Sequence, residues 1–179
     1  MMRKILLTGR PGVGKTTLLI ETIRELEGRG LNVGGMISQE VRDGGMRVGF
    51  EIFDLASGRK GWLAHVAQQE GPQIGKYRVN LKDLVEIGVN AINQAASDST
   101  TSVIAIDEVG PMELCSEDFR NAVKKAVEAE KPLIGTIHYK ARSTLIDDIR
   151  SRSDVKIIEI THDNRSYVKG AVLNELLQA

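Results

Sequence analysis

Gly9, Gly14, Lys15 and Thr16, within TGRPGVGKTT (Thr8–Thr17), are the residues whose types and spacing most clearly indicate chemistry. They satisfy the pattern G-x-x-x-x-G-K-[ST], in which successive backbone N–H groups surround a β-phosphate and the lysine reaches the β- and γ-oxygens. An apolar run precedes the stretch and a helix-like run follows it, which is the context that the pattern requires. The sequence therefore predicts a phosphate loop that leads into the positive end of a helix.

A second group of chemically suited residues ends the apolar run VIAIDEVG, where Asp107 is followed by Glu108. Two acids at the end of a buried strand are unfavourable unless a cation lies there. We expect Mg²⁺ as the cofactor, held by the Thr16 hydroxyl and by Asp107, because this ion prefers oxygen and needs few protein ligands beside phosphates. Glu108 is then the expected general base that polarises an attacking water.

The next apolar run, LIGTIHY, places Thr136 and His138 near its end. Either residue is a candidate sensor of the γ-phosphate. The alternative is that Thr136 is an ordinary strand residue and His138 a surface imidazole.

These residues must be positioned by an alternation of strands and helices. Short, nearly continuous apolar runs predict strands buried on both faces of a sheet: RKILLT, LNVGGMISQ, SVIAIDEV, KPLIGTIH and VKIIEIT. Apolar residues with helical period separate them, in KTTLLIETIRELEGRG, LKDLVEIGVNAINQAA and SEDFRNAVKKAVEAEK, the last with Ser116 as its expected N-cap. This alternation predicts an α/β layered fold.

One segment departs from the alternation, with strand-like runs at Met46–Leu55 and Lys60–Val66 between glycine-rich turns. It predicts a β-hairpin insertion. Because a further strand fits between the phosphate loop and Asp107, we expect the RecA-like, additional-strand branch of the P-loop NTPase folds. The predicted architecture is a three-layer α/β P-loop NTPase fold with a mostly parallel central sheet, and residues 1–179 form a single domain.

Composition narrows the classes of function. The 24 basic and 24 acidic residues of the 179 balance, which argues against a nucleic-acid partner or an anionic membrane. No apolar run approaches the roughly 18 residues that span a bilayer, so we expect a cytoplasmic protein without membrane contact. Cys115 is the single cysteine, which excludes an internal disulfide.

At DEVGPMEL (Asp107–Leu114) the sequence resembles the THEP-type nucleoside-triphosphatase family, which includes the cancer-related nucleoside triphosphatase of animals. Four further stretches agree in the same order along nearly the whole chain: GRPGVGKTT, RVGFEIFDLASG, GKYRV and THDNR. The resemblance implies a monomeric, slow, magnesium-dependent hydrolase. Its substrates would be several nucleoside triphosphates, among them ATP, GTP, CTP and UTP, which it would cut to diphosphate and phosphate.

The resemblance assigns Glu108 the activation of water and leaves the role of Glu113 open, between orienting Glu108, holding a magnesium water and capping the next helix. Pro111 stands where some relatives carry lysine, so the resemblance assigns no role to a charge at this position. The phosphate and magnesium roles fall on the loop, whose expected nucleotide contacts are Gly9, Arg10, Pro11, Gly12, Val13, Gly14, Lys15, Thr16 and Thr17.

A positive charge should meet the transition state, because the γ-phosphoryl group spreads its charge over three oxygens. The candidates are Arg10, Arg47, Arg142 and Arg165. We favour Arg165, in the family-like THDNR, with Asn164 beside it near the base or ribose. The alternative is that Arg165 makes a salt bridge at a helix start.

The chain has no guanine-reading N-K-x-D motif and few aromatic residues that could stack on a base, so we expect permissive base recognition. We assign Trp62 to packing within the hairpin rather than to stacking on a base. Two other functions fit the same loop. One is a nucleotide or small-molecule kinase with ARSTLIDDIRSR as its lid, and the other is a nucleotide-dependent switch in RNA handling or assembly.

Overall fold

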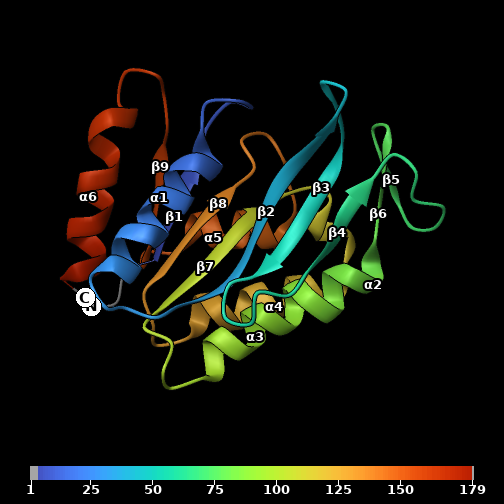
Figure 1. The fold of residues 1–179 in the computed structure, drawn as a ribbon. Helices are drawn as coiled ribbons and strands as arrows, with labels where there is room; N and C mark the ends of the chain where they lie inside the picture. The colour runs from blue at the N-terminus through green and yellow to red at the C-terminus, as the bar shows by residue number, and fades with distance from the viewer. Residues whose placement is uncertain (1–3, 179) are drawn as a thin grey trace.

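The computed structural model describes residues 4–178, and these residues build one twisted sheet with helices on both faces (Figure 1). The sheet has nine strands in the order β5-β6-β4-β3-β2-β7-β8-β1-β9. The strands are β1 (Lys4–Thr8), β2 (Val33–Asp43), β3 (Met46–Asp54), β4 (Lys60–His65), β5 (Gln73–Ile74), β6 (Tyr77–Val79), β7 (Val103–Val109), β8 (Leu133–Ile137) and β9 (Val155–Glu159).

The helices are α1 (Lys15–Gly28), α2 (Leu81–Asp83), which continues through a π-helical turn (Leu84–Val89) into α3 (Asn90–Ser97), α4 (Glu117–Glu128), α5 (Thr144–Ser151) and α6 (Arg165–Leu177), with a 3₁₀ turn at Glu113–Cys115. Helices form in the three predicted periodic segments, as α1, as α2 to α3 and as α4, whereas α5 and α6 were not predicted from the apolar period. The expected N-cap of α4 is confirmed, since Ser116 Oγ accepts a hydrogen bond from Phe119 N at 3.1 Å.

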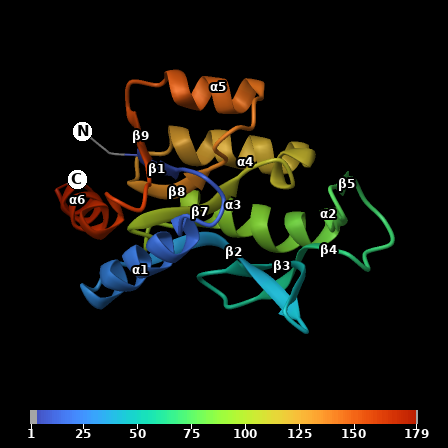
Figure 2. The ribbon, with the colours of Figure 1, turned by 90° about the horizontal axis from the view of Figure 1, so that it is seen from above.

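Two apolar cores lie on opposite faces of the sheet, so that the molecule has three layers (Figure 2). Successive residues of a strand point to opposite faces, and Leu6 accordingly packs in the core under α3, α4 and α5, whereas Ile5 and Leu7 pack in the core under α1 and α6. The burial of β1, β7 and β8 on both faces explains why their sequences are nearly continuous apolar runs. The expectation that VKIIEIT is buried on both faces was wrong, because β9 lies at the edge of the sheet and is only partly buried.

The expectation of a mostly parallel sheet was wrong, because the sheet is mixed. Within the described residues, β2, β7, β8, β1 and β9 pair in parallel, and β3, β4, β6 and β5 extend the sheet beyond β2 by antiparallel pairing. The strands of the expected hairpin form, at Met46–Asp54 and Lys60–His65, but they belong to the main sheet. The physical reason is that a strand joined to β2 by the tight Gly44–Gly45 turn pairs with the free edge of β2.

The strand order settles which segments meet at the site. Strand β8 lies between β1, which leads into the phosphate loop, and β7, which ends in the acids. The carboxyl ends of these parallel strands share one edge of the sheet, where α/β proteins bind ligands. Among the described residues, no helix is both long and apolar enough to cross a membrane.

Gly35 shows how closely β2 and β7 approach. Its φ is +118°, and a Cβ placed there would lie 2.0 Å from the carbonyl oxygen of Ala105. We predict that Gly35→Ala lowers the free energy of unfolding by about 2–4 kcal/mol, through the clash and the left-handed backbone. Urea denaturation measures the change.

Gly170 supplies the matched control, since it lies within α6 with nothing near the position of its Cβ. Gly170→Ala should raise the free energy of unfolding by about 0.5–1 kcal/mol, because alanine favours helix more than glycine does. Equal effects of the two substitutions would contradict the described packing of β2 on β7.

Candidate functional site

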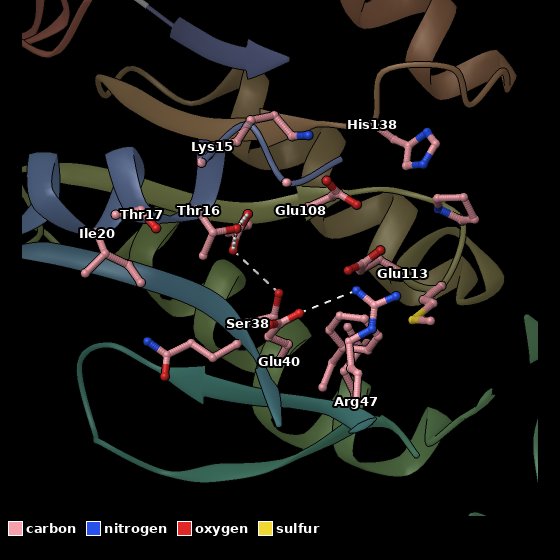
Figure 3. A pocket seen from close by; sticks show the side chains of 18 of the residues that line it. Lys15, Thr16, Thr17, Ile20, Ser38, Glu40, Arg47, Glu108, Glu113 and His138 are labelled. Atoms are coloured by element: carbon pink, nitrogen blue, oxygen red, sulfur yellow. Dashed lines mark hydrogen bonds and ion pairs between the residues drawn. The ribbon is translucent and has the colours of Figure 1, made fainter. Parts of the chain in front are cut away.

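The predicted phosphate loop connects β1 to α1, and its residues Gly12, Gly14, Lys15, Thr16 and Thr17 line a cavity of about 660 Å³ (Figure 3). Helix α1 begins at Lys15, and its N-cap Gly14 has a φ of +99° and makes no side-chain cap. The first N–H groups of α1 therefore have no side-chain oxygen of the N-cap as a partner, which suits them to bind an anion.

Lys15 folds back over the loop in this structure. Its Nζ donates hydrogen bonds to the carbonyl oxygens of Gly9 at 2.7 Å and Arg10 at 3.5 Å. The ammonium group thus lies at the mouth of the loop, where the chemistry of the motif requires a cation for the outer phosphate oxygens.

Asp107 is the buried centre of the site, with only 1% of its surface exposed. Three hydroxyls from different elements surround its carboxylate: Thr136 Oγ1 donates at 2.5 Å, Thr16 Oγ1 at 3.1 Å and Ser38 Oγ at 3.5 Å. Burial raises the pKa of Asp107 above its ordinary value, and the hydrogen bonds from Thr136 and Thr16 offset only part of this rise. Ser38 was missed from the sequence, although it is the first polar residue after the apolar part of β2.

Thr136 and His138, the two sensor candidates, have different positions. Thr136 is fully buried, and its hydroxyl is directed at Asp107. His138 lines the cavity, and its Nδ1 accepts hydrogen bonds from the backbone N–H of Lys140 at 3.2 Å and Ala141 at 2.9 Å. Burial and then the charge of Lys15 lower the pKa of His138, which favours the neutral ring.

Glu108 and Glu113 both face the cavity from the end of β7 and the turn after it (Figure 3). Burial first, and the charge of Asp107 second, raise the pKa of Glu108 to about 7, although Lys15 opposes this. Glu113 is 4% exposed, and burial together with the charge of Glu108 raises its pKa well above the ordinary range. Hydrogen bonds from its own backbone and from that of Glu108 partly offset this rise in the pKa of Glu113.

Arg165 reaches the loop from the opposite side to the acids. Its guanidinium lies against Gly14, where a Cβ would meet Nη1 at 2.7 Å. Asn164, by contrast, uses its side chain within the turn before α6: Oδ1 accepts from Thr161 N at 2.8 Å and Nδ2 donates to Glu159 O at 2.7 Å. Neither Arg165 nor Asn164 is among the residues that line the cavity.

The other arginine candidates separate clearly. Arg47 lines the cavity from β3. Arg10 is exposed on the loop, and Arg142 is 80% exposed and pairs with Asp147 at 3.5 Å. The segment Ala141–Arg152, considered above as a kinase lid, forms the cap and body of α5, and none of its arginines lines the cavity.

The far wall of the cavity was not foreseen from the sequence. It is formed by β2, β3, β4, β5 and the turn after β7, and its residues are Gln39, Glu40, Arg47, Phe50, Leu63, Ile74 and Met112. Trp62 is not among these residues. Its half-buried ring packs edge-on against that of His65, with the ring centroids 4.5 Å apart. The sequence signals for this wall were the candidate Arg47 and the family-like stretch RVGFEIFDLASG, which contains Arg47 and Phe50.

Comparison with known proteins agrees with this geometry. Residues 4–173 match the sequence family described as NTPase. A curated relative named nucleoside-triphosphatase THEP1, from Thermofilum pendens, is 45% identical over 97% of this chain and 95% of its own length. The protein of the same name from Methanosarcina acetivorans is 39% identical over 99% of this chain and 98% of its own length.

The chain belongs to the THEP1-type nucleoside-triphosphatase family. Solved structures of similar proteins have the same fold. THEP1 from Aquifex aeolicus superposes with a TM-score of 0.84 at 31% identity, covering 97% of this chain and 98% of that one. The human cancer-related nucleoside triphosphatase superposes with a TM-score of 0.83 at 33% identity, covering 99% and 98%. The resemblance inferred from DEVGPMEL and the other stretches is confirmed.

The crowded acids predict a pH-dependent stability of the protein without metal or nucleotide. An acid whose pKa is raised on folding stabilises the folded state only while it is protonated there. Because the pKa of Glu108 rises from 4.5 to about 7, the free energy of unfolding should fall as pH rises from about 5 to 8, by roughly 2–3 kcal/mol. Glu113 contributes in the same direction.

Glu108→Gln should reduce this pH dependence and stabilise the protein at pH 8, as measured by urea denaturation in EDTA. Glu130→Gln, a substitution at an exposed position after α4, is the control and should leave the dependence intact. A free energy of unfolding that rises between pH 5 and 8 would contradict the described burial of the acids.

Proposed function

We propose that the protein hydrolyses nucleoside triphosphates to diphosphate and phosphate, with Mg²⁺ as cofactor and Glu108 as the base that activates water. The observation that carries the proposal is the position of Glu108, which lines the same cavity as Lys15, Thr16 and Asp107. A general base must lie within reach of the nucleophile and have a pKa near the working pH, and a pKa of about 7 meets the second requirement.

The residues around Asp107 fit a magnesium ion. Asp107 is a buried carboxylate, and the side chains that hydrogen-bond to it among residues 4–178 are hydroxyls rather than cations. Thr16 and Asp107 would hold Mg²⁺, which supplies charge neutralisation at the β- and γ-phosphate oxygens when bound. Among residues 4–178, no three His, Cys, Asp or Glu side chains form a metal cluster, as expected for an ion held largely by phosphates and water.

Other residues take supporting roles in this proposal. The loop residues 9–17 hold the phosphates through backbone N–H groups, and Lys15 turns from Gly9 O toward the γ-phosphate. Arg165 supplies positive charge beside Gly14. Glu113, which is buried and lines the same cavity as Glu108, orients that base rather than capping α4, a task that Ser116 performs.

The topology supports the additional-strand branch of P-loop NTPases, because β8 separates β1 from β7. In this branch a glutamate next to the strand-end aspartate polarises water, which is the role proposed here for Glu108. Base recognition is permissive in this proposal, since the side-chain groups of Asn164 are already bonded within the turn before α6.

Removal of the base should separate chemistry from binding. Glu108→Gln keeps the shape of the side chain but cannot accept a proton, so kcat for ATP should fall by roughly 10²–10⁴. The affinity for a non-hydrolysable ATP analogue should be retained, as measured by calorimetry. Glu130→Gln should hydrolyse ATP like the wild type, and an undiminished kcat in Glu108→Gln would show that Glu108 is not the base.

Permissive base recognition predicts similar turnover of ATP, GTP, CTP, UTP and their deoxy forms. The values of kcat/KM should lie within about tenfold of one another, because buried groups that read one base would impose far larger differences. Phosphate release without any added acceptor measures the rates, and EDTA should abolish them. A strong preference for one base, or no release from any triphosphate, would contradict this reading.

A further inference from the structure

The half of the cavity next to β3 has no assigned occupant. Its wall, which we call the hairpin wall, consists of Glu40, Arg47, Phe50, Leu63, Ile74 and Met112. Figure 3 shows Arg47 rising from β3 toward Glu113, across the cavity from the phosphate loop. The volume of the whole cavity, about 660 Å³, is in the range typical of organic ligands rather than of water alone.

The triphosphate proposed above does not account for this half. In the sheet order, β3 lies on one side of β7 and β8, and β1 and β9 lie on the other. Arg165, on the β9 side, contacts Gly14 of the loop. A nucleotide with its γ-phosphate at Asp107 and Glu108 and its nucleoside toward Arg165 therefore leaves the hairpin wall facing the far side of the γ-phosphate. The inference below rests on this proposed position.

Arg47 gives the hairpin wall a held positive charge. Its Nε donates to Tyr77 Oη at 2.9 Å, and its Nη1 donates to Glu40 Oε2 at 3.4 Å. The guanidinium lies 5.2 Å from the centroid of the Phe50 ring and 5.8 Å from that of Tyr77. Two aromatic rings and a hydroxyl thus restrict the side chain. The bonds to Tyr77 and Glu40 use one N–H group each, on Nε and Nη1, and the guanidinium has further N–H groups on Nη1 and Nη2. A restricted guanidinium with further donors is suited to a phosphate oxygen.

The remainder of the hairpin wall is apolar with a polar edge. Phe50, Ile74 and Met112 offer apolar surface, whereas Leu63 is almost fully buried. Glu40, and Gln39 next to the hairpin wall on β2, offer hydrogen-bonding groups beside that surface. The hairpin wall thus combines an apolar surface, a polar edge and the guanidinium of Arg47. A ligand that matches them has a flat ring, polar atoms at the edge of that ring and an anionic group. A nucleoside monophosphate has these three parts.

We propose that the hairpin wall is a second ligand site, which binds a nucleoside monophosphate while the phosphate loop holds the triphosphate. The base packs against Phe50 and Ile74, and the phosphate pairs with Arg47 on the γ-phosphate side of the cavity. The ligand occupies space through which water reaches Glu108, so it lowers the rate of phosphate release without competing with ATP.

Calorimetry on the full chain tests the site. The protein is saturated with Mg²⁺ and a non-hydrolysable ATP analogue and then titrated with AMP, GMP, CMP and UMP, and with the nucleoside of whichever monophosphate binds most tightly. One monophosphate should bind per chain, about tenfold or more tightly than its nucleoside, because the phosphate adds a charge-assisted hydrogen bond. Failure of all four to bind, or displacement of the analogue by the monophosphate, overturns the proposal.

Variants locate the site on the hairpin wall. Arg47→Met should remove most of the advantage of the monophosphate over its nucleoside, and Phe50→Leu should weaken both ligands. Arg42→Met is the matched control: Arg42 faces Arg47 across the β2–β3 register and also pairs with Glu40, but it does not line the cavity. Thermal unfolding checks that each variant folds. Equal losses in Arg42→Met and Arg47→Met overturn the assignment.

Steady-state kinetics gives the second readout. The monophosphate should lower kcat for phosphate release from ATP and leave KM for ATP unchanged, whereas a rise in KM alone would place it in the phosphate loop and overturn the proposal. Failure of the proposed hydrolysis is distinguishable from failure of this site. An inactive protein that binds the monophosphate beside the analogue retains the second site, and an active protein that does not bind it lacks the site.

Discussion

A buried carboxylate at the end of β7 is the constraint on which the rest of the structure depends. Asp107 is almost completely removed from solvent, and an unpaired charge in that position is costly. Hydroxyls from α1, β2 and β8 offset part of the cost, through Thr16, Ser38 and Thr136. In the sheet, β7 lies between β2 and β8, which brings Ser38 and Thr136 to Asp107 from the two neighbouring strands. The site therefore requires this strand order.

Three acids, Asp107, Glu108 and Glu113, lie at one end of the cavity, and their burial there has a cost in stability. In addition to the effect of burial, the charge of Asp107 raises the pKa of Glu108, and the charges of Glu108 and Asp107 raise that of Glu113. Such crowding weakens the folded state when no cation is bound, and functional sites commonly carry costs of this kind. The two apolar cores on either face of the sheet supply the stability that tolerates it.

The sheet also separates two environments around the phosphate loop. On the side of β9, the guanidinium of Arg165 approaches Gly14. On the side of β3, the antiparallel strands form a wall that combines Arg47 with Phe50 and other apolar residues. The antiparallel half of the sheet, which was expected only as an insertion, therefore contributes directly to the cavity.

The sequence by itself determined the phosphate loop, the acid pair and the strands and helices that carry them, because these depend on local backbone requirements and on the period of apolar residues. Only the tertiary structure decided that β3 to β6 join the main sheet, that Thr136 and Ser38 both bond Asp107, and that Arg47 faces the cavity rather than solvent. Strand pairing and the facing of a side chain depend on contacts between residues far apart in the chain, and a local pattern does not contain that information.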